Sequence, residues 1–290
     1  MSPLDFLTTS FELFVIALFL VSVVAGIFGA MLGLGGGVII VPVLTLGFGI
    51  NIHYAIGASI ISVIATSSGA AATYVRDRLT NIRLAMLLEV ATTAGALIGA
   101  ILSTHVAERY LFLVFAAILI YSVWIMFKKG RDSSLPIEKS DYWSKRLKLA
   151  SVYPDHARNE NIPYGVKGVP LGFLLMGGAG VISGLLGIGS GALKVPAMDS
   201  VMHVPLKVST ATSNFMIGVT ASASAGAYYM HNDIIPILAA PVAVGVLVGS
   251  WLGTRIMMRL HSRAIRIVFM VFLLIIALQM ILNAFGVRVR

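Results

Sequence analysis

The segment Gly33-Leu-Gly-Gly-Gly-Val-Ile-Ile-Val-Pro42 recurs without a gap as Gly187-Ile-Gly-Ser-Gly-Ala-Leu-Lys-Val-Pro196. The second copy follows at an offset of 154 residues, from 33 to 187. At the same offset four further pairs of residues coincide: Ser59 with Ser213, Thr66 with Thr220, Ser68 with Ser222, and Tyr74 with Tyr228. Self-similarity at one fixed offset indicates an internal repeat, so we interpret the chain as a duplication.

The chain is too apolar for a water-soluble domain. Of its 290 residues, 58% are hydrophobic and only 11% are charged, and the mean hydropathy is +0.94. This composition predicts a protein whose solvent is the lipid bilayer. The chain has no cysteine, which excludes disulfides and thiol chemistry. The formal net charge of +9 is typical of basic cytoplasmic loops in a membrane protein, and we expect no nucleic-acid partner.

Apolar stretches long enough to cross a bilayer recur along the chain. We expect eight full membrane-spanning helices at 12–31, 53–75, 84–104, 109–127, 168–186, 208–230, 234–254 and 265–285. Two further apolar segments, 33–49 and 187–204, begin with glycines and are interrupted by Pro42 and Pro196. Each of these two segments either crosses the membrane as a short broken helix or re-enters on the side from which it came.

The distribution of basic residues selects between these alternatives, because cytoplasmic loops carry an excess of Lys and Arg. If both short segments cross, both termini lie outside and the basic residues gather inside. These inside residues are Arg76, Arg78, Arg83, nine in the stretch 128–167, Lys207, Arg255, Arg259, Arg263 and Arg266. If neither segment crosses, the four arginines that follow Thr254 fall outside, which the rule disfavours. We therefore expect five spans in each half.

An odd number of spans per half inserts the second copy upside down, which is the inverted-repeat plan of many secondary transporters. The predicted fold is thus an all-α polytopic helical bundle of two inverted-topology repeats, with eight full spans and two short, broken ones. We assign 1–127 to the first membrane repeat, 128–167 to a cytoplasmic linker and 168–290 to the second membrane repeat. The predicted location is the inner (cytoplasmic) membrane, with several passes and with lipid on all sides.

The G-x-G-G-G-x-x-x-x-P motif at 33–42, its second copy and the hydroxyl-rich stretches 55–62 and 208–214 resemble the sulfite exporter TauE/SafE family of membrane proteins. The resemblance covers nearly the whole chain apart from the central linker. It implies a secondary transporter that moves sulfite, an organosulfonate or a related sulfur anion across the cytoplasmic membrane, in the export direction and without a cofactor. An importer, or a channel for another small anion, is the alternative.

Enzyme motifs are missing from the sequence. There is no H-E-x-x-H or H-x-x-x-H pair to hold a metal, no G-x-S-x-G around a nucleophilic serine and no Walker A sequence. We therefore expect neither catalysis nor a bound metal ion.

A small oxyanion that leaves water needs positive potential and hydrogen-bond donors inside the membrane. Glycine runs that precede short helices supply both, because they allow positive φ and expose the N–H groups of a helix start. The predicted substrate-binding residues are Gly35, Gly36, Gly37, Ser59, Gly189, Ser190, Gly191, Lys194, Ser213 and Asn214. The alternative use of such glycines is close packing of helices, which we expect for Gly95, Gly99, Gly245 and Gly249.

Lys194 is the most informative single residue, since an ammonium group inside an apolar segment is costly without a partner. Two interpretations stay open at this point. Lys194 is either the fixed charge that attracts the anion, or a lysine that reaches the membrane surface or pairs with Asp199. The first repeat carries Ile40 at the equivalent position, which fits a single asymmetric site.

Coupling to protons requires a titratable group on the transport path. The candidates are Glu89, within a predicted span, and His53, at the predicted outer mouth. Glu89 follows Arg83 by six residues, so an ion pair near the membrane surface is the competing interpretation.

Overall fold

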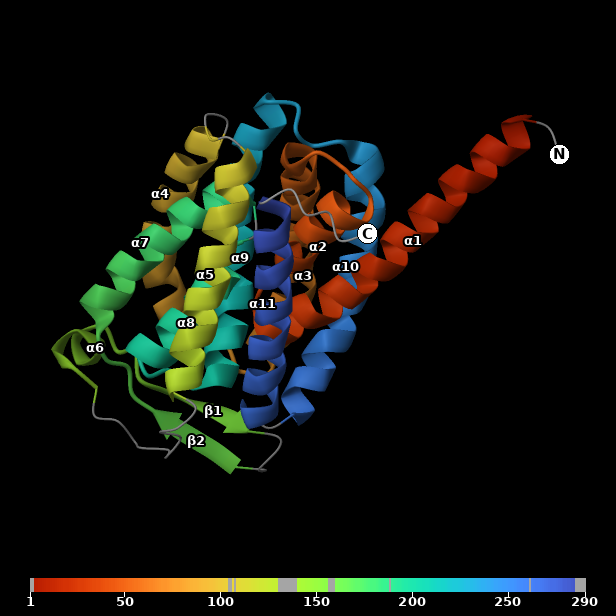
Figure 1. Ribbon diagram of the computed structural model, residues 1–290. Helices are drawn as coiled ribbons and strands as arrows, with labels where there is room; N and C mark the ends of the chain where they lie inside the picture. Colours follow the sequence, from red (N-terminus) through yellow and green to blue (C-terminus); the bar gives the residue numbers. More distant parts are fainter. Residues whose placement is uncertain are drawn as a thin grey trace.

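Two series of helices with the same order make up the computed structural model (Figure 1), which describes residues 3–103, 106, 108–129, 140–155, 160–187, 189–260 and 262–284. The first series is α1 (Pro3–Leu32), α2 (Gly37–Pro42), the π-helical turn η1 (Val43–Gly47), α3 (Ile52–Arg76), α4 (Ile82–Ser103) and α5 (Glu108–Lys129). The second series is α7 (Val169–Leu186), α8 (Gly191–Pro196), the π-helical turn η2 (Ala197–Val201), α9 (Leu206–Met230), α10 (Pro236–Arg259) and α11 (Ser262–Ala284). Each half therefore contains a short helix continued by a π-helical turn.

Six helices of the described part are long and apolar enough to cross a membrane. They are Glu12–Leu32, Ile52–Arg76, Ile82–Leu102, Val169–Leu186, Pro236–Arg259 and Arg263–Leu282. The expectation of an all-α membrane protein is confirmed at this level, whereas the eight full spans and the inversion of the repeats stay predictions. The central helix α9 is not among the six, because Ser, Thr and Asn at many of its positions lower its hydropathy.

The two halves pack mainly against each other. Helix α1 runs along α10, and the equivalent helix α7 runs along α4. The long helices α3 and α9 meet in the centre, and α5 packs on α11, the pair in front in Figure 1. Because each of these contacts joins one half to the other, neither half forms a separate bundle.

Glycines allow the close approach of the paired helices. A Cβ atom added to Gly95 or Gly99 of α4 would overlap the backbone of α7, and one added to Gly245 or Gly249 of α10 would overlap the backbone of α1. These four glycines therefore serve helix packing, as expected.

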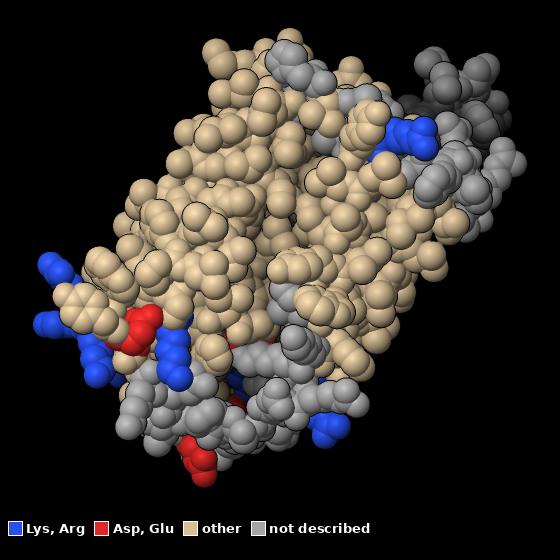
Figure 2. Space-filling view, turned by 60° about the vertical axis from the view of Figure 1, so that its left-hand side comes forward, with Lys and Arg blue, Asp and Glu red and all other residues tan. Residues whose placement is uncertain are grey.

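The linker contains a β-hairpin that the sequence analysis did not predict. It follows the short helix α6 (Tyr142–Arg146) and consists of β1 (Ser151–Asp155) and β2 (Glu160–Tyr164), which pair antiparallel with Tyr153 opposite Ile162. In Figure 1 the hairpin lies under the lower end of the bundle. Figure 2 shows that most Lys and Arg side chains of the visible face gather at this same end, while the middle of that face carries no charge.

Buried polar contacts hold the hairpin against the bundle. Lys207 at the start of α9 donates to Asp155 Oδ1 at 2.7 Å, and both side chains are buried. The Asn81 amide, between α3 and α4, donates to Leu149 O at 2.8 Å and to the Tyr164 hydroxyl at 3.0 Å. Burial raises the pKa of Tyr164 to about 12, so this phenol stays neutral at physiological pH. The linker is thus anchored to the two central helices.

Replacing Asp155 by alanine tests this anchor. Lys207 then keeps a buried charge without its carboxylate partner, which costs about 3–5 kcal/mol. We expect faster tryptic cleavage of the linker at Lys145 and Arg146 and a lower apparent melting temperature in detergent. The matched control is Asp77→Ala, which removes the ion pair between Asp77 and Arg76. The Arg76 side chain is 77% exposed, so losing this pair should cost less than about 1 kcal/mol of stability. Equal effects of the two variants would contradict a buried anchor.

Candidate functional site

A glycine-rich turn separates α1 from α2, and an equivalent turn separates α7 from α8. We call these turns the first and the second break, and they meet in the centre of the bundle. Gly35 of the first break and Gly189 of the second both lie against the side chains of Val63 and Ile217. These two residues stand close to the midpoints of α3 and α9. The two copies of the glycine motif therefore lie next to each other in the folded chain.

The backbone at each break takes the left-handed conformation that glycine favours. The φ angles are +78° at Gly35, +73° at Gly36 and +77° at Gly189. Ser190, which replaces the equivalent glycine, also has a positive φ of 54° and donates its hydroxyl to Gly189 O at 2.7 Å. The helices α2 and α8 begin directly after these residues, at Gly37 and Gly191. The motif thus turns the chain sharply between two helices.

Hydroxyl groups from the opposite half fasten each break. Ser59 Oγ donates to Gly187 O at 2.8 Å, and Ser213 Oγ donates to Gly33 O at 2.8 Å. The two bonds are related by the offset of the repeat. Both serines were predicted to bind substrate, but in this conformation their protons are engaged by the protein backbone.

Two tyrosines make a second pair of equivalent bonds, each within its own half of the chain. The Tyr74 hydroxyl donates to Ala30 O at 3.0 Å, and the Tyr228 hydroxyl donates to Gly184 O. Both acceptors lie near the carboxyl end of the helix that precedes a break. Four hydroxyl groups at equivalent positions therefore satisfy carbonyl groups around the two breaks.

Asn214 occupies a related position without an equivalent in the first half. Its Nδ2 donates to Ala30 O at 2.8 Å and to Thr210 O at 3.1 Å. Its Oδ1 and the hydroxyl of Thr210 are both buried and have no hydrogen-bond partner among the described residues. Buried polar atoms of this kind are uncommon and mark a place where a further polar group fits.

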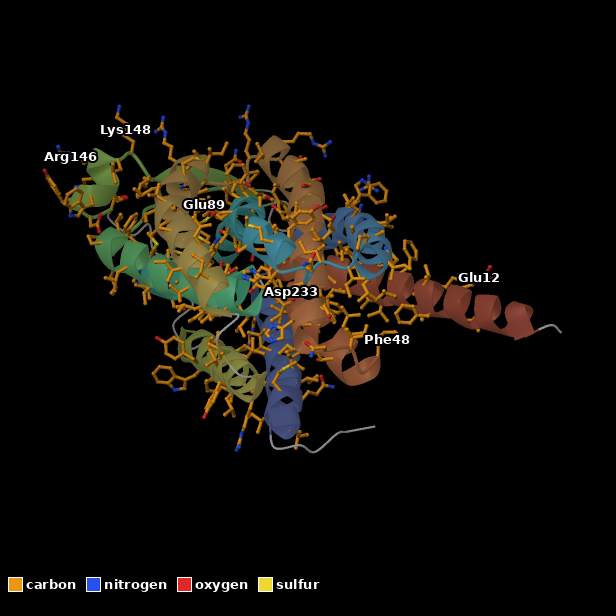
Figure 3. All side chains as sticks on the ribbon, turned by 90° about the horizontal axis from the view of Figure 1, so that it is seen from above. Glu12, Phe48, Glu89, Arg146, Lys148 and Asp233 are labelled. Carbon is orange, nitrogen blue, oxygen red and sulfur yellow. The ribbon has the colours of Figure 1, made fainter. Side chains whose placement is uncertain are left out.

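Lys194 forms the one buried cation of the second break. Its side chain is 0% exposed, and its Nζ donates to Thr220 Oγ1 at 2.7 Å and lies 3.4 Å from Glu89 Oε2. Thr220 in turn donates to Glu89 Oε1 at 2.5 Å. The three side chains come from α8, α9 and α4. Figure 3 shows Glu89 on α4 beside the teal segments that contain α8 and α9.

Threonines complete the surroundings of the Glu89 carboxylate. Thr92 donates to Oε2 and Thr93 donates to Oε1, each at 3.0 Å. These residues follow Glu89 by three and four positions, the spacing that places side chains on one helix face. We call Glu89, Lys194, Thr220, Thr92 and Thr93 the ion-pair cluster. Lys194 follows Gly191 by three residues, so it lies about one helical turn beyond the second break.

The cluster excludes some of the interpretations that the sequence left open. Lys194 does not reach the membrane surface, and its carboxylate partner is Glu89 rather than Asp199. Glu89 is not paired with Arg83, whose guanidinium donates to Lys148 O at 3.2 Å. The sequence identifies both charged residues but does not show that they form an ion pair, because they are 105 positions apart.

His53, the other candidate for proton coupling, lies away from this cluster. Its backbone N–H donates to Asn51 Oδ1 at 2.9 Å at the start of α3. Val63, beside the breaks, is ten residues further along the helix, or about 15 Å. Nearby Asp233 has its pKa raised by burial, against the lowering effect of His53 and His231. Among the described residues, no three His, Asp or Glu side chains are grouped so that they would hold a metal ion.

Comparisons with known proteins agree with this architecture. The family model described as Sulfite exporter TauE/SafE matches residues 18–280. The "Probable membrane transporter protein YunE" of Bacillus subtilis (strain 168) is 26% identical over 278 residues, which cover 92% of this chain and 97% of that protein. The "Probable membrane transporter protein YdhB" of the same organism is 24% identical over 243 residues, which cover 84% and 89%. No solved structure gives a significant match.

Gly191→Ala tests the contact between the two breaks. An added Cβ would overlap the carbonyl oxygen of Gly33, so we expect the variant to lose monodispersity in detergent or to melt at a clearly lower temperature. Gly178→Ala is the control, because a Cβ there has no neighbour within 4 Å and alanine stabilises a helix interior by about 0.5–1 kcal/mol. A Gly191→Ala protein as stable as Gly178→Ala would contradict the close contact.

Lys194→Ala tests the ion pair. It leaves the buried Glu89 carboxylate uncompensated, so we expect the free energy of unfolding to fall by about 3–5 kcal/mol. The double variant Lys194→Met/Glu89→Gln removes both charges and should recover most of this loss. Denaturant unfolding in detergent measures both, and a double variant no more stable than Lys194→Ala would show that the pair is not coupled.

Proposed function

Since the chain belongs to the sulfite exporter TauE/SafE family, we propose that it exports sulfite, an organosulfonate or a related sulfur anion across the cytoplasmic membrane as a secondary transporter. The family and the relatives establish the coarser statement, that the chain is a multi-pass membrane transporter and not an enzyme. The substrate class and the export direction are the proposal, and they rest on the family's printed description.

The observation that carries the proposal is the buried ammonium of Lys194. A charge at the centre of a membrane protein is costly, and the few that occur mark substrate paths or ion sites. Lys194 is 0% exposed and lies beside the breaks. It supplies the positive potential that a sulfonate or sulfite group needs when it leaves water. The Thr220 hydroxyl accepts from this ammonium at 2.7 Å and holds it in place.

We propose that the other residues predicted to bind substrate donate hydrogen bonds to it in a second conformation of the protein. In the present one Ser59 and Ser213 are bonded to backbone carbonyls of the breaks. When the breaks separate, these hydroxyls and the amide of Asn214 become free to turn toward an anion. The proposed site then also includes the backbone of the two breaks at Gly35, Gly36, Gly37, Gly189, Ser190 and Gly191.

We propose the inverted-repeat membrane arrangement as the frame of this motion, with 1–127 and 168–290 as the two repeats and 128–167 as the cytoplasmic linker. The repeated order of elements and the exchange of helix pairs between the halves support it. Eight full spans and two short ones place the hairpin end inside. The basic residues at that end of the visible face support this orientation (Figure 2).

Anion binding to the purified protein tests the proposal directly. Sulfite, sulfate, thiosulfate, taurine and sulfoacetate are compared by thermal shift in detergent, with chloride as the reference ion. A specific ligand present at 100 times its Kd stabilises the folded state by about 2.7 kcal/mol. We expect such a shift with at least one sulfur anion.

The charge-neutral variant Lys194→Met/Glu89→Gln is the control for the site. It keeps the volume of the cluster and removes its positive charge, so the expected shift is lost while the protein stays folded. A shift that persists in this variant would move the anion site away from Lys194. No shift of the wild type with any of the five anions would remove the sulfur-anion assignment.

A further inference from the structure

We propose that Glu89 is the resident counter-anion of Lys194 and the proton acceptor of the site, so that one monovalent anion binds together with one proton. The inference rests on the proposed anion transport and specifies what that transport requires. In the resting state the Glu89 carboxylate balances the ammonium. When a proton neutralises Glu89, Lys194 is left with a charge that a substrate anion balances.

The charges of the cluster lead to this stoichiometry. Lys194 and Glu89 sum to zero in a buried place, with exposures of 0% and 8%. A monovalent anion that bound without a proton would leave one excess negative charge there, which is costly in a medium of low polarity. The anion and an ionised carboxylate beside the same ammonium would also repel each other. A proton on Glu89 removes both costs.

The ammonium of Lys194 has one N–H donor left for a second anion. Its oxygen neighbours in the described part are Thr220 Oγ1 at 2.7 Å and Glu89 Oε2 at 3.4 Å. The longer distance is that of a loose ion pair. An ammonium has three N–H donors, so one remains for a substrate oxygen beside the two that these contacts use.

The donors around Glu89 suit a group that changes its protonation state. Thr92, Thr93 and Thr220 all contact the carboxylate through hydroxyl groups. A hydroxyl group can donate or accept a hydrogen bond. Any of the three threonines can therefore rotate its hydroxyl and accept a hydrogen bond from a neutral carboxyl group. Amide or guanidinium donors would fix the carboxylate in its ionised form. The threonines therefore stabilise Glu89 in both states.

The ionisable groups on the elements around Glu89 are the possible competitors for its proton. Helix α7 contains none. Those on α9, α5 and η2 are Lys207, Tyr228, Tyr229, Glu108, Arg109, Tyr110, Tyr121, Lys128, Lys129 and Asp199. Lys207 is thirteen residues, or about 20 Å, from Thr220 along α9, and it is paired with Asp155. Asp199 is buried five residues beyond Lys194, so it is the competing proton acceptor that the experiment has to exclude.

Two properties of transport follow. The loaded site carries no net charge, so anion movement through it is electroneutral, and its direction depends on the anion and proton gradients together. A divalent anion such as sulfate leaves one negative charge in the site even after Glu89 is protonated. The site therefore selects hydrogensulfite or a sulfonate over sulfate.

Proton uptake on anion binding tests this coupling. Methanesulfonate is the probe, because it stays monovalent over the whole working range and releases no proton itself. It is added to purified protein in weakly buffered detergent solution with a pH-sensitive dye, and binding is followed in parallel by thermal shift. We expect uptake of about one proton per bound anion, and an affinity that falls about tenfold per pH unit wherever that uptake is seen.

Three variants identify the acceptor. Glu89→Gln should bind methanesulfonate with an affinity that does not change with pH and with no proton uptake. Asp199→Asn should behave as the wild type, and so should Glu12→Gln, which changes an exposed carboxylate on α1 far from the cluster (Figure 3). If Glu89→Gln does not fold, the wild type and Asp199→Asn still decide whether a proton is taken up and whether Asp199 takes it.

The outcomes separate this inference from the proposed function. Anion binding without proton uptake overturns the coupling and leaves the anion site in place. Uptake that is lost in Asp199→Asn but kept in Glu89→Gln overturns the role of Glu89. The absence of binding of methanesulfonate and of every sulfur anion tested above removes the proposed function, and the coupling falls with it.

Discussion

The fold depends on how the carbonyl groups at its two helix breaks are satisfied. Inside a membrane protein, a backbone polar group without a partner costs several kcal/mol, because no water is present to replace the missing bond. Gly33 O and Gly187 O are such groups, and each accepts a hydrogen bond from a serine of the opposite half, Ser213 or Ser59. Neither break is therefore stable without the other half of the chain.

This mutual dependence explains why the halves interlock instead of forming two bundles. The long helices that carry the serines, α3 and α9, have to reach across the centre, which places them against each other. The helices that precede the breaks, α1 and α7, are then held from outside by α10 and α4. Glycines at the contacts let these pairs approach closely, so the fastening in the centre and the packing at the periphery support the same arrangement.

The two equivalent series of helices and their glycine-rich breaks were predictable from the sequence, because their signals are local or repeated. The glycine motif, its second copy and the aligned serines and tyrosines all follow one offset, and helix-packing glycines recur at helical spacing. The ion pair carries no such signal, since Lys194 and Glu89 belong to helices whose packing no periodicity reveals. The hairpin was missed because Pro154 and Pro163 stand in its two strands, and proline argues against a strand away from a sheet edge. In a hairpin of two strands, however, both are edge strands.

The contrast between a repeated frame and a single charge follows from the cost of burying ions. A lysine in place of Ile40 would put a second ammonium beside the breaks. At the offset of 150 residues that aligns Gly95 and Gly99 with Gly245 and Gly249, the equivalent of Glu89 is Ala239, so this charge would have no carboxylate. A second cation near the centre, without a carboxylate of its own, would oppose folding by repulsion from Lys194 and by the loss of its hydration. One lysine with one carboxylate keeps the centre neutral at rest and leaves a single charge to exchange partners. In the proposed transporter, the duplication therefore supplies the two halves that move, and the departure from it at Lys194 and Glu89 supplies the place where a charged ligand is held.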